Sequence, residues 1–301
     1  MAQVYPQESK KVICGLFGNS RQAWYDRKRW LSEHQMQEVF ILKQAKLLRA
    51  EHKRMGAEKI LHLLKDVLHE HGIKYGRDKF YNLLAEHGLL VKRRRSTRTT
   101  NSHHFYRKYP NLVRDLDLTS SGKLWVSDIT YIRTRLGFVY LSLITDAYSR
   151  KIVGWNLWPN LTSEVALGAL RMAVESEGVK QGLIHHSDRG IQYCCNDYVL
   201  YLKGSHIEIS MTENGDPYEN ALAERINGIL KNEYGLEDTF SNYLHASEAV
   251  KTAVHKYNNQ RPHASCNYMV PAEAHHCHGE LKKRWKPKSK EPADNTFEMQ
   301  K

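Results

Sequence analysis

An acid inside a strand-like apolar run is the feature that most constrains how this chain can fold. Residues 124–132 are rich in β-branched and aromatic side chains and contain a single carboxylate, Asp128. Residues 184–190 begin as a short apolar run and end with Asp188 and a glycine-containing turn. Both patterns predict buried strands. Because a buried carboxylate needs a partner or a metal ion, the fold has to bring these two acids to a polar site.

A helix expected over residues 216–233 supplies a third acid. Its apolar residues recur at helical spacing; they are Leu222, Ile226, Ile229 and Leu230. Glu224 and Lys231 are seven residues apart on it and therefore project from nearly the same side. There are 59 residues between Asp128 and Asp188, and 35 between Asp188 and Glu224.

The pattern around these acids predicts an α/β domain. Strand-like runs at 123–134, 138–147 and 151–157 are followed by a helix capped by Ser163, a strand at 183–186, a helix at 193–203 and a strand at 207–210. Three consecutive strands followed by alternating helices and strands favour a five-stranded mixed sheet with helices on its faces.

These acids and the residues near them resemble the OrfB-type transposases of the insertion-sequence-3 family, which share a catalytic core with retroviral integrases. The matching segments are His186 to Tyr193, Ile209 to Met211, Asn220 with Ala221, and Tyr257 to His263. The resemblance implies a ribonuclease-H-like fold for residues 122–280. It also implies that Asp128, Asp188, Glu224 and Lys231 are catalytic.

The same resemblance implies metal-dependent cutting and joining of double-stranded DNA. Two Mg²⁺ ions, for which Mn²⁺ can substitute, would be held by Asp128, Asp188 and Glu224, and such a pair suits an in-line displacement at phosphorus. Lys231 would contact phosphate, His186 and Asn220 would support the site, and Arg261 would contact DNA. The substrates would be the element's terminal inverted repeats and a target DNA.

The resemblance also implies an assembly larger than one chain. Two element ends have to meet in one complex, so we expect at least a dimer on DNA. Related proteins often arise as a fusion with the product of an upstream reading frame.

Helical, basic segments come before the predicted core. Residues 1–35 are expected to form a helix-turn-helix-like pair and residues 36–91 a second helix-turn-helix-like DNA-binding domain; a plain helical hairpin with a basic outer face is the alternative. Residues 92–121 read as a basic linker, and residues 281–301 as a basic, disordered tail. The expected DNA contacts in these segments are Arg21, Arg27, Lys28, Arg29, Arg77, Lys79, Asn82, Lys92, Arg93, Arg94, Arg95 and Arg98.

The distribution of charge agrees with this division. The net charge is +12, and residues 1–121 contain 24 Lys and Arg against 12 Asp and Glu. Residues 122–280 contain 14 against 18. A basic periphery around a slightly acidic centre suits a protein that holds a polyanion outside and a divalent cation inside.

Several other classes fit the sequence less well. The chain shows no 18-residue apolar run and no secretory leader, so we expect a bacterial cytoplasmic protein without membrane contact. Its five cysteines contain no Cys-x-x-Cys pair, and the histidines and cysteines between His263 and His278 match no structural zinc spacing. A nuclease that uses the same acids, or an inactive DNA-binding repressor, remains an alternative.

Overall fold

The computed structural model describes residues 9–16, 18–91, 105–114, 116–213 and 220–281. The chain divides into two compact units, residues 1–94 and 95–301. The predictions for Lys92, Arg93, Arg94, Arg95 and Arg98, and for residues 282–301 of the tail, lie outside the described residues.

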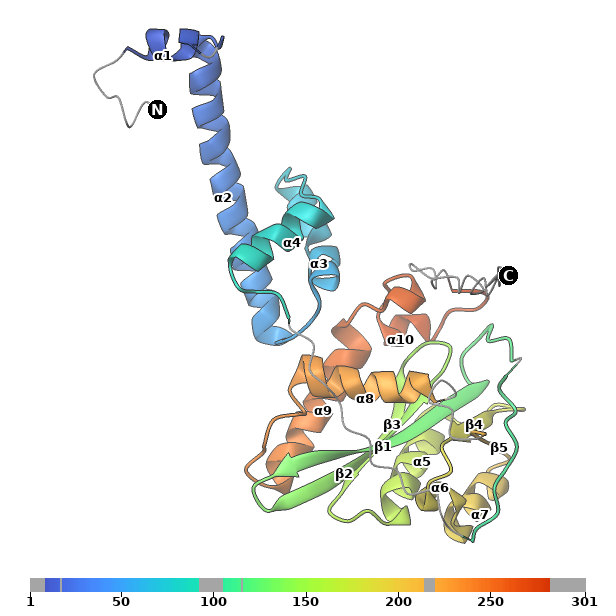
Figure 1. Cartoon of the computed structure of the whole chain (residues 1–301). Coiled ribbons are helices and arrows are strands. Elements are labelled where there is room, and N and C mark those ends of the chain that lie inside the picture. Colours follow the sequence, from blue (N-terminus) through green and yellow to red (C-terminus); the bar gives the residue numbers. More distant parts are fainter. Residues whose placement is uncertain (1–8, 17, 92–104, 115, 214–219, 282–301) are drawn as a thin grey trace, which may run out of the picture. The chain divides into compact units, whose positions relative to one another are not determined.

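Helices make up the N-terminal unit (Figure 1): α1 (Lys10–Leu16), α2 (Arg21–Glu51), α3 (Ala57–Glu70) and α4 (Arg77–Glu86). Ser20 caps α2, because its side chain accepts a hydrogen bond from the backbone N–H of Ala23 at 3.0 Å. The boundary predicted between residues 35 and 36 is wrong, since α2 runs unbroken for 31 residues. No Gly or Pro occurs between Arg21 and Glu51 to end the helix there.

The core of this unit lies at the C-terminal half of α2. Buried apolar residues of three helices meet there: Ile41, Leu42 and Ala45 of α2, Ile60, Leu64 and Leu68 of α3, and Phe80, Leu83 and Leu84 of α4. The basic residues that were predicted to contact DNA are exposed, as is Asn82; they are Arg21, Arg27, Lys28, Arg29, Arg77 and Lys79. None of the helices in the described ranges is long and apolar enough to cross a membrane.

The second unit contains the predicted five-stranded mixed sheet, in the order β3-β2-β1-β4-β5. Its strands are β1 (Leu124–Thr134), β2 (Gly137–Asp146), β3 (Ile152–Trp158), β4 (Ile184–Ser187) and β5 (Glu208–Met211). The first three strands pair antiparallel, whereas β4 is parallel to both β1 and β5. This order and direction are those of the ribonuclease-H-like fold.

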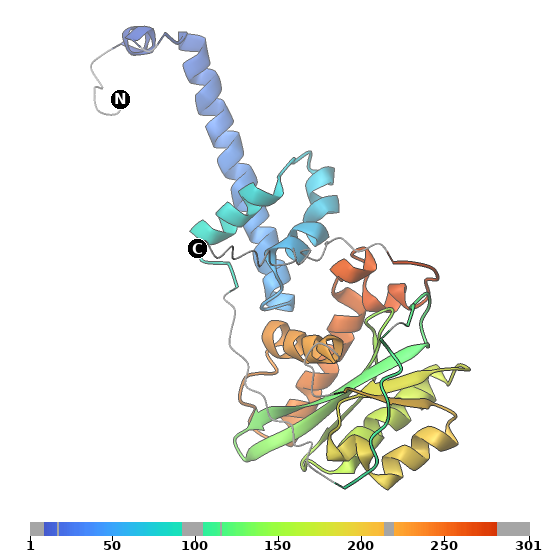
Figure 2. The ribbon, with the colours of Figure 1, turned by 45° about the vertical axis from the view of Figure 1, so that its right-hand side comes forward.

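Helices cover both faces of this sheet (Figure 2). They are α5 (Ser163–Glu177), α6 (Ile191–Cys194), α7 (Asn196–Gly204), α8 (Ala221–Tyr234) and α9 (Tyr243–Gln260), and the short α10 (Pro271–Ala274) packs against α9. One apolar core joins the sheet to α5, α6 and α7 through residues such as Trp125, Leu170 and Tyr198. A second joins it to α8 and α9 through residues such as Ile132 and Ile226.

Three local predictions need correction. The helix expected over 193–203 is two helices, because Cys195 takes an extended conformation (φ −66°, ψ 153°) between α6 and α7. The residue at the N-cap of α5 is Thr162 rather than Ser163.

The third correction concerns the predicted linker over residues 92–121. Its later part packs on the catalytic unit: the N–H of Leu112 donates to Ser210 Oγ at 2.9 Å, and the N–H of Met211 donates to the carbonyl of Pro110 at 3.2 Å. The apolar side chains of this segment, which include Val113 and Leu118, give it a packed surface.

Candidate active site

Strand pairing places Asp128 beside Asp188. β1 and β4 run parallel, with Val126 opposite His186 as the last registered pair. Asp128 and Asp188 each follow two residues later, so both acids lie at the same edge of the sheet. Asp128 shares a sheet face with Val126, which packs against Ala223 of α8. The two predicted acids are therefore brought together under that helix.

A tight turn holds Asp188. The N–H of Gly190 donates to Asp188 Oδ1 at 2.9 Å. A Cβ atom at position 190 would lie 2.9 Å from the same oxygen, closer than real side chains come. Glycine at 190 therefore lets the turn close over the carboxylate.

Helix α8 adds two amides to the site. Asn227 donates from Nδ2 to Asp128 Oδ2 at 2.8 Å, and Asn220, at the N-cap of the helix, donates from Nδ2 to the carbonyl of Ser127 at 3.1 Å. Glu224 lies between them in the first turn and is exposed. The role of Asn227 was missed in the sequence, although its position three residues after Glu224 puts it on the same helix face.

The acids repel one another. Burial, followed by the charges of Asp188 and Glu224, raises the pKa of Asp128 to about 7, while the hydrogen bond from Asn227 acts in the opposite direction. Such a displaced pKa marks a candidate functional site. A cation placed among these groups would remove most of this cost.

The donors present fit a hard divalent cation. Mg²⁺ prefers oxygen ligands such as carboxylates and keeps several bound waters. Amide oxygens can accept hydrogen bonds from those waters. Two further acceptors, Oδ1 of Asn220 and Oδ1 of Asn227, are buried and have no hydrogen-bond partner among the residues that the structure describes. In the part of the chain that the structure describes, no three His, Cys, Asp or Glu side chains are gathered as a finished metal site.

Lys231 lies two helical turns after Glu224, as predicted. Its Nζ stands 4.1 Å from the centre of the Tyr131 ring. Burial lowers the pKa of the Lys231 ammonium, which Tyr131, Glu237 and Asp128 partly offset. Asp128 is therefore near enough for its charge to act on Lys231.

The two histidines before Asp188 are buried. His186 Nδ1 lies 2.8 Å from Ser210 Oγ, so its ring links β4 to β5 beneath the site. His185 lies 2.9 Å from the Tyr198 hydroxyl, and burial lowers its pKa to about 3. His185 is therefore a neutral core residue, and the supporting role of His186 stays a prediction.

The predicted DNA contact of Arg261 is wrong. Its side chain is buried, with 2% of the residue exposed, and forms two hydrogen bonds of 2.8 Å each to the carboxylate of Glu233. Its guanidinium also lies over the ring of Tyr257. Arg261 therefore joins α8 to the end of α9 inside the fold and is not available to a phosphate.

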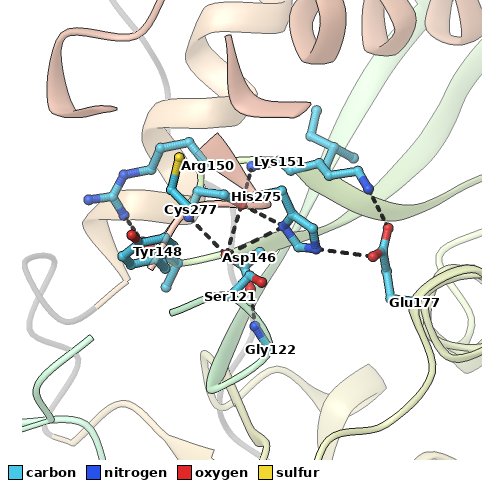
Figure 3. A network of polar contacts seen from close by, with 12 residues as sticks. Ser121, Gly122, Asp146, Tyr148, Arg150, Lys151, Glu177, His275 and Cys277 are labelled. Carbon is cyan, nitrogen blue, oxygen red and sulfur yellow. Dashed lines mark hydrogen bonds and ion pairs between the residues drawn. The ribbon is translucent and has the colours of Figure 1, made fainter. Parts of the chain in front are cut away.

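His275, which follows α10, joins a polar network with residues at the end of β2, in the turn after it and on α5 (Figure 3). His275 lies 2.8 Å from Ser149 Oγ through Nδ1 and 3.0 Å from Glu177 Oε2 through Nε2. Lys151 pairs with the other oxygen of Glu177 at 2.6 Å. Fully buried Asp146 accepts hydrogen bonds from Ser149 and from the N–H of Gly122.

The fold and the acids on β1, after β4 and on α8 define a class of enzyme: a ribonuclease-H-like polynucleotidyl transferase. Two family models described as integrase core domains match the chain, over residues 119–217 and 205–271. The matched residues include the sheet and all three acids.

Curated relatives come from bacterial mobile elements. The chain is 35% identical over 264 residues to the insertion element IS600 uncharacterized 31 kDa protein of Shigella sonnei, a match that covers 86% of this chain and 96% of the relative. It is 34% identical over 224 residues to the transposase of IS629 from the same species, covering 74% of each. Transposase InsF of IS3A from Escherichia coli is 29% identical over 277 residues, with 88% and 93% covered.

The chain belongs to the insertion-sequence-3 family of DNA transposases. Among solved structures, the magnesium complex of the HTLV-2 integrase catalytic core domain is similar at 20% identity, with a TM-score of 0.43 and coverage of 52% of this chain and 98% of that chain.

Proposed function

We propose that this transposase binds the terminal inverted repeats of its own element and performs divalent-metal-dependent 3′-end cleavage and strand transfer at Asp128, Asp188 and Glu224. The observation that carries the proposal is the strand register that puts Asp128 and Asp188 at one sheet edge under the helix of Glu224. The pKa of Asp128, raised by burial and by the other two acids, supports it.

Two displacements at phosphorus make up the proposed reaction. In cleavage, a water oxygen bonds to the phosphorus at the element end, the bond from phosphorus to the 3′ oxygen breaks, and a 3′ hydroxyl is released. In strand transfer, that hydroxyl attacks a second phosphodiester, so one P–O bond forms as another breaks. When bound, two Mg²⁺ ions supply Lewis acidity to the attacking and leaving oxygens; use of Mn²⁺ instead belongs to the same proposal.

The residues of this chain divide the remaining work. Asp128, Asp188 and Glu224 would hold the cations, Asn227 would orient Asp128, and Lys231 would bind a nearby phosphate. Asn220 and His186 would fix the surrounding backbone of β1 and β4. The exposed basic residues of α2 and α4 would hold the DNA outside the site.

The assembly and its location follow from this chemistry. Joining two ends requires two catalytic units, so we infer at least a homodimer on DNA, with fusion to an upstream reading-frame product as a further form. Work on chromosomal DNA would place the protein in the bacterial cytoplasm, at the nucleoid.

A duplex carrying the element's own end, taken from the DNA that flanks its gene, tests the proposal. We expect nicking and joining with Mg²⁺ by the wild type, loss of both in Glu224→Gln with end binding kept, and full activity in the matched exposed variant Glu248→Gln. Nicking without joining would support the nuclease alternative, and binding without either reaction the repressor. Nicking by Glu224→Gln would overturn the assignment.

A further inference from the structure

Lys231 is held by an aromatic ring instead of an acid. Its ammonium lies 4.1 Å from the centre of the Tyr131 ring, inside the range of a cation–π interaction. The side chain is partly buried. Within the described ranges, no carboxylate forms an ion pair with it.

The end of β4 creates the place where Tyr131 and Lys231 meet. β1 pairs with β4 only from Leu124 to Val126, whereas it pairs with β2 as far as Thr134. Helix α8 lies along the outer half of β1, since its Ile226, Ile229 and Leu230 share an apolar cluster with Ile132. Lys231 can therefore reach across the open edge of the strand to Tyr131.

Helix and strand advance by the same amount from the acids. Seven residues separate Glu224 from Lys231, or about 10 Å of helix rise. Three residues separate Asp128 from Tyr131, or about 10 Å of strand. The backbone positions of Lys231 and Tyr131 thus lie about 10 Å along their elements from Glu224 and Asp128, which corresponds to about three nucleotides of rise along one DNA strand.

The ring that holds Lys231 is itself supported. Phe138, on the neighbouring strand, packs edge-to-face against Tyr131 with the ring centres 5.1 Å apart. The guanidinium of Arg133 lies 5.6 Å from the centre of the Phe138 ring. Two aromatic rings and two cations therefore follow one another along the β1–β2 ribbon.

We propose that Tyr131 is a positioning residue that orients the Lys231 ammonium toward a backbone phosphate of the element end. The inference rests on the proposed function. A carboxylate in place of the ring would neutralise Lys231 and compete with the phosphate. A ring attracts the ammonium through its π face and leaves the full positive charge for the DNA.

The face of the ring, not its hydroxyl, does this. Among the described residues, the Tyr131 hydroxyl has no hydrogen-bond partner. Phenylalanine at position 131 should therefore hold Lys231 as tyrosine does, whereas leucine, which is apolar but has no π face, should not.

A double-mutant cycle on the full chain tests the proposal by end binding in Ca²⁺ and by joining in Mg²⁺. We expect Tyr131→Phe to match the wild type and Tyr131→Leu to lose about tenfold in both, the order of a partly buried cation–π interaction. In a Lys231→Ala background, Tyr131→Leu should cause no further loss. Tyr201→Leu is the matched control, because Tyr201 also carries a cation, Arg171, over its ring.

Each contrary result has one meaning. A Tyr131→Leu variant equal to the wild type, or losses that add in the double variant, would overturn the positioning role. Thermal melts identify a variant that fails to fold, and the lysine spectrum of the wild type, which needs no variant, then tests the contact. Joining that survives in Glu224→Gln would reject the proposed function instead.

A measurement without DNA checks the contact itself. In the proton–carbon spectrum of lysine-labelled protein, the ring current of Tyr131 should shift one Hε signal upfield. That signal should be absent from Lys231→Ala, lose its shift in Tyr131→Leu and keep it in Tyr131→Phe. A wild-type spectrum without an upfield-shifted lysine would contradict the structure on which the inference stands.

Discussion

Asn227 donates a hydrogen bond of 2.8 Å to Asp128, and it does so from the helix that carries Glu224. An ionised carboxylate can only accept hydrogen bonds, so the amide nitrogen of Asn227 faces Asp128. The amide oxygen then faces the remainder of the site. One side chain thereby ties the first strand of the sheet to the helix of the third acid.

Replacing Asn227 with leucine should lower metal affinity and joining by about 10- to 100-fold, the usual effect of losing a residue that orients a metal ligand. Titration with Mn²⁺ followed by the joining assay measures both. Asn232→Leu, on the outer part of the same helix, should behave as the wild type. Equal losses in the two variants would instead show damage to α8.

Asp128 should destabilise the metal-free fold at neutral pH. Its folded pKa of about 7 exceeds the ordinary aspartate value of 3.8, so folding favours the protonated acid, and stability is lost as pH rises from about 4 through about 7. Asp128→Asn should therefore raise the unfolding free energy at pH 8 by about 1–4 kcal/mol and leave it nearly unchanged at pH 4.

Urea unfolding with and without Mg²⁺ checks this prediction. Mg²⁺ should stabilise the wild type and not Asp128→Asn, because the cation offsets the repulsion that the substitution removes. Asp117→Asn, an exposed acid of the same unit, is the control. A variant less stable than the wild type at pH 8 would refute the assignment of repulsion.

Arg261 should contribute to the stability of the fold and not to DNA binding. Arg261→Met removes both hydrogen bonds that the largely buried carboxylate of Glu233 receives from Arg261, so we expect a loss of about 3–5 kcal/mol in unfolding free energy. The double variant with Glu233→Met should recover most of it. The salt dependence of end binding should stay that of the wild type, as it should for Lys251→Met on α9. If end binding by Arg261→Met depended less steeply on salt concentration than end binding by the wild type, Arg261 would contact DNA after all.

Glu177 should make the unfolding free energy depend on pH in the acidic range. The hydrogen bond from His275, together with Lys151, lowers its pKa to about 2 from 4.5. Because the folded pKa is depressed, its stabilisation is present above pH 4.5 and is lost as pH falls toward 2. Glu177→Gln should cost about 1–2 kcal/mol at pH 7, less than the whole pKa shift implies because solvent screens this partly exposed carboxylate, and progressively less below pH 4.5. Glu175→Gln, its exposed neighbour, should show no such change, and a pH-independent difference would argue against the network.

The sheet and the acids could be predicted because their signals are local. A lone carboxylate in a β-branched run, such as Asp128, is visible in nine residues. The length of α2 was missed because its middle carries exposed apolar residues, including Leu31, Met36 and Val39, which obscure the helical period.

Contacts between distant segments were beyond a local pattern. Glu233 and Arg261 are 28 residues apart, and nothing near Arg261 shows that it is paired. Tyr131 and Lys231 meet only because β4 ends early, which is a property of the whole sheet. Asn227 is the exception, since its spacing from Glu224 was open to inspection.

The closure of the catalytic unit also has a consequence for its synthesis. Residues near its start meet residues near its end, for the N–H of Gly279 donates to Thr119 and His275 reaches Ser149 and Glu177. A nascent chain cannot make these contacts until residue 279 has left the ribosome exit tunnel. Contacts between residues so far apart in the sequence form late. When translation has just passed α8, the three acids have been synthesised, but the contacts that join the start of the catalytic unit to its end have not yet formed.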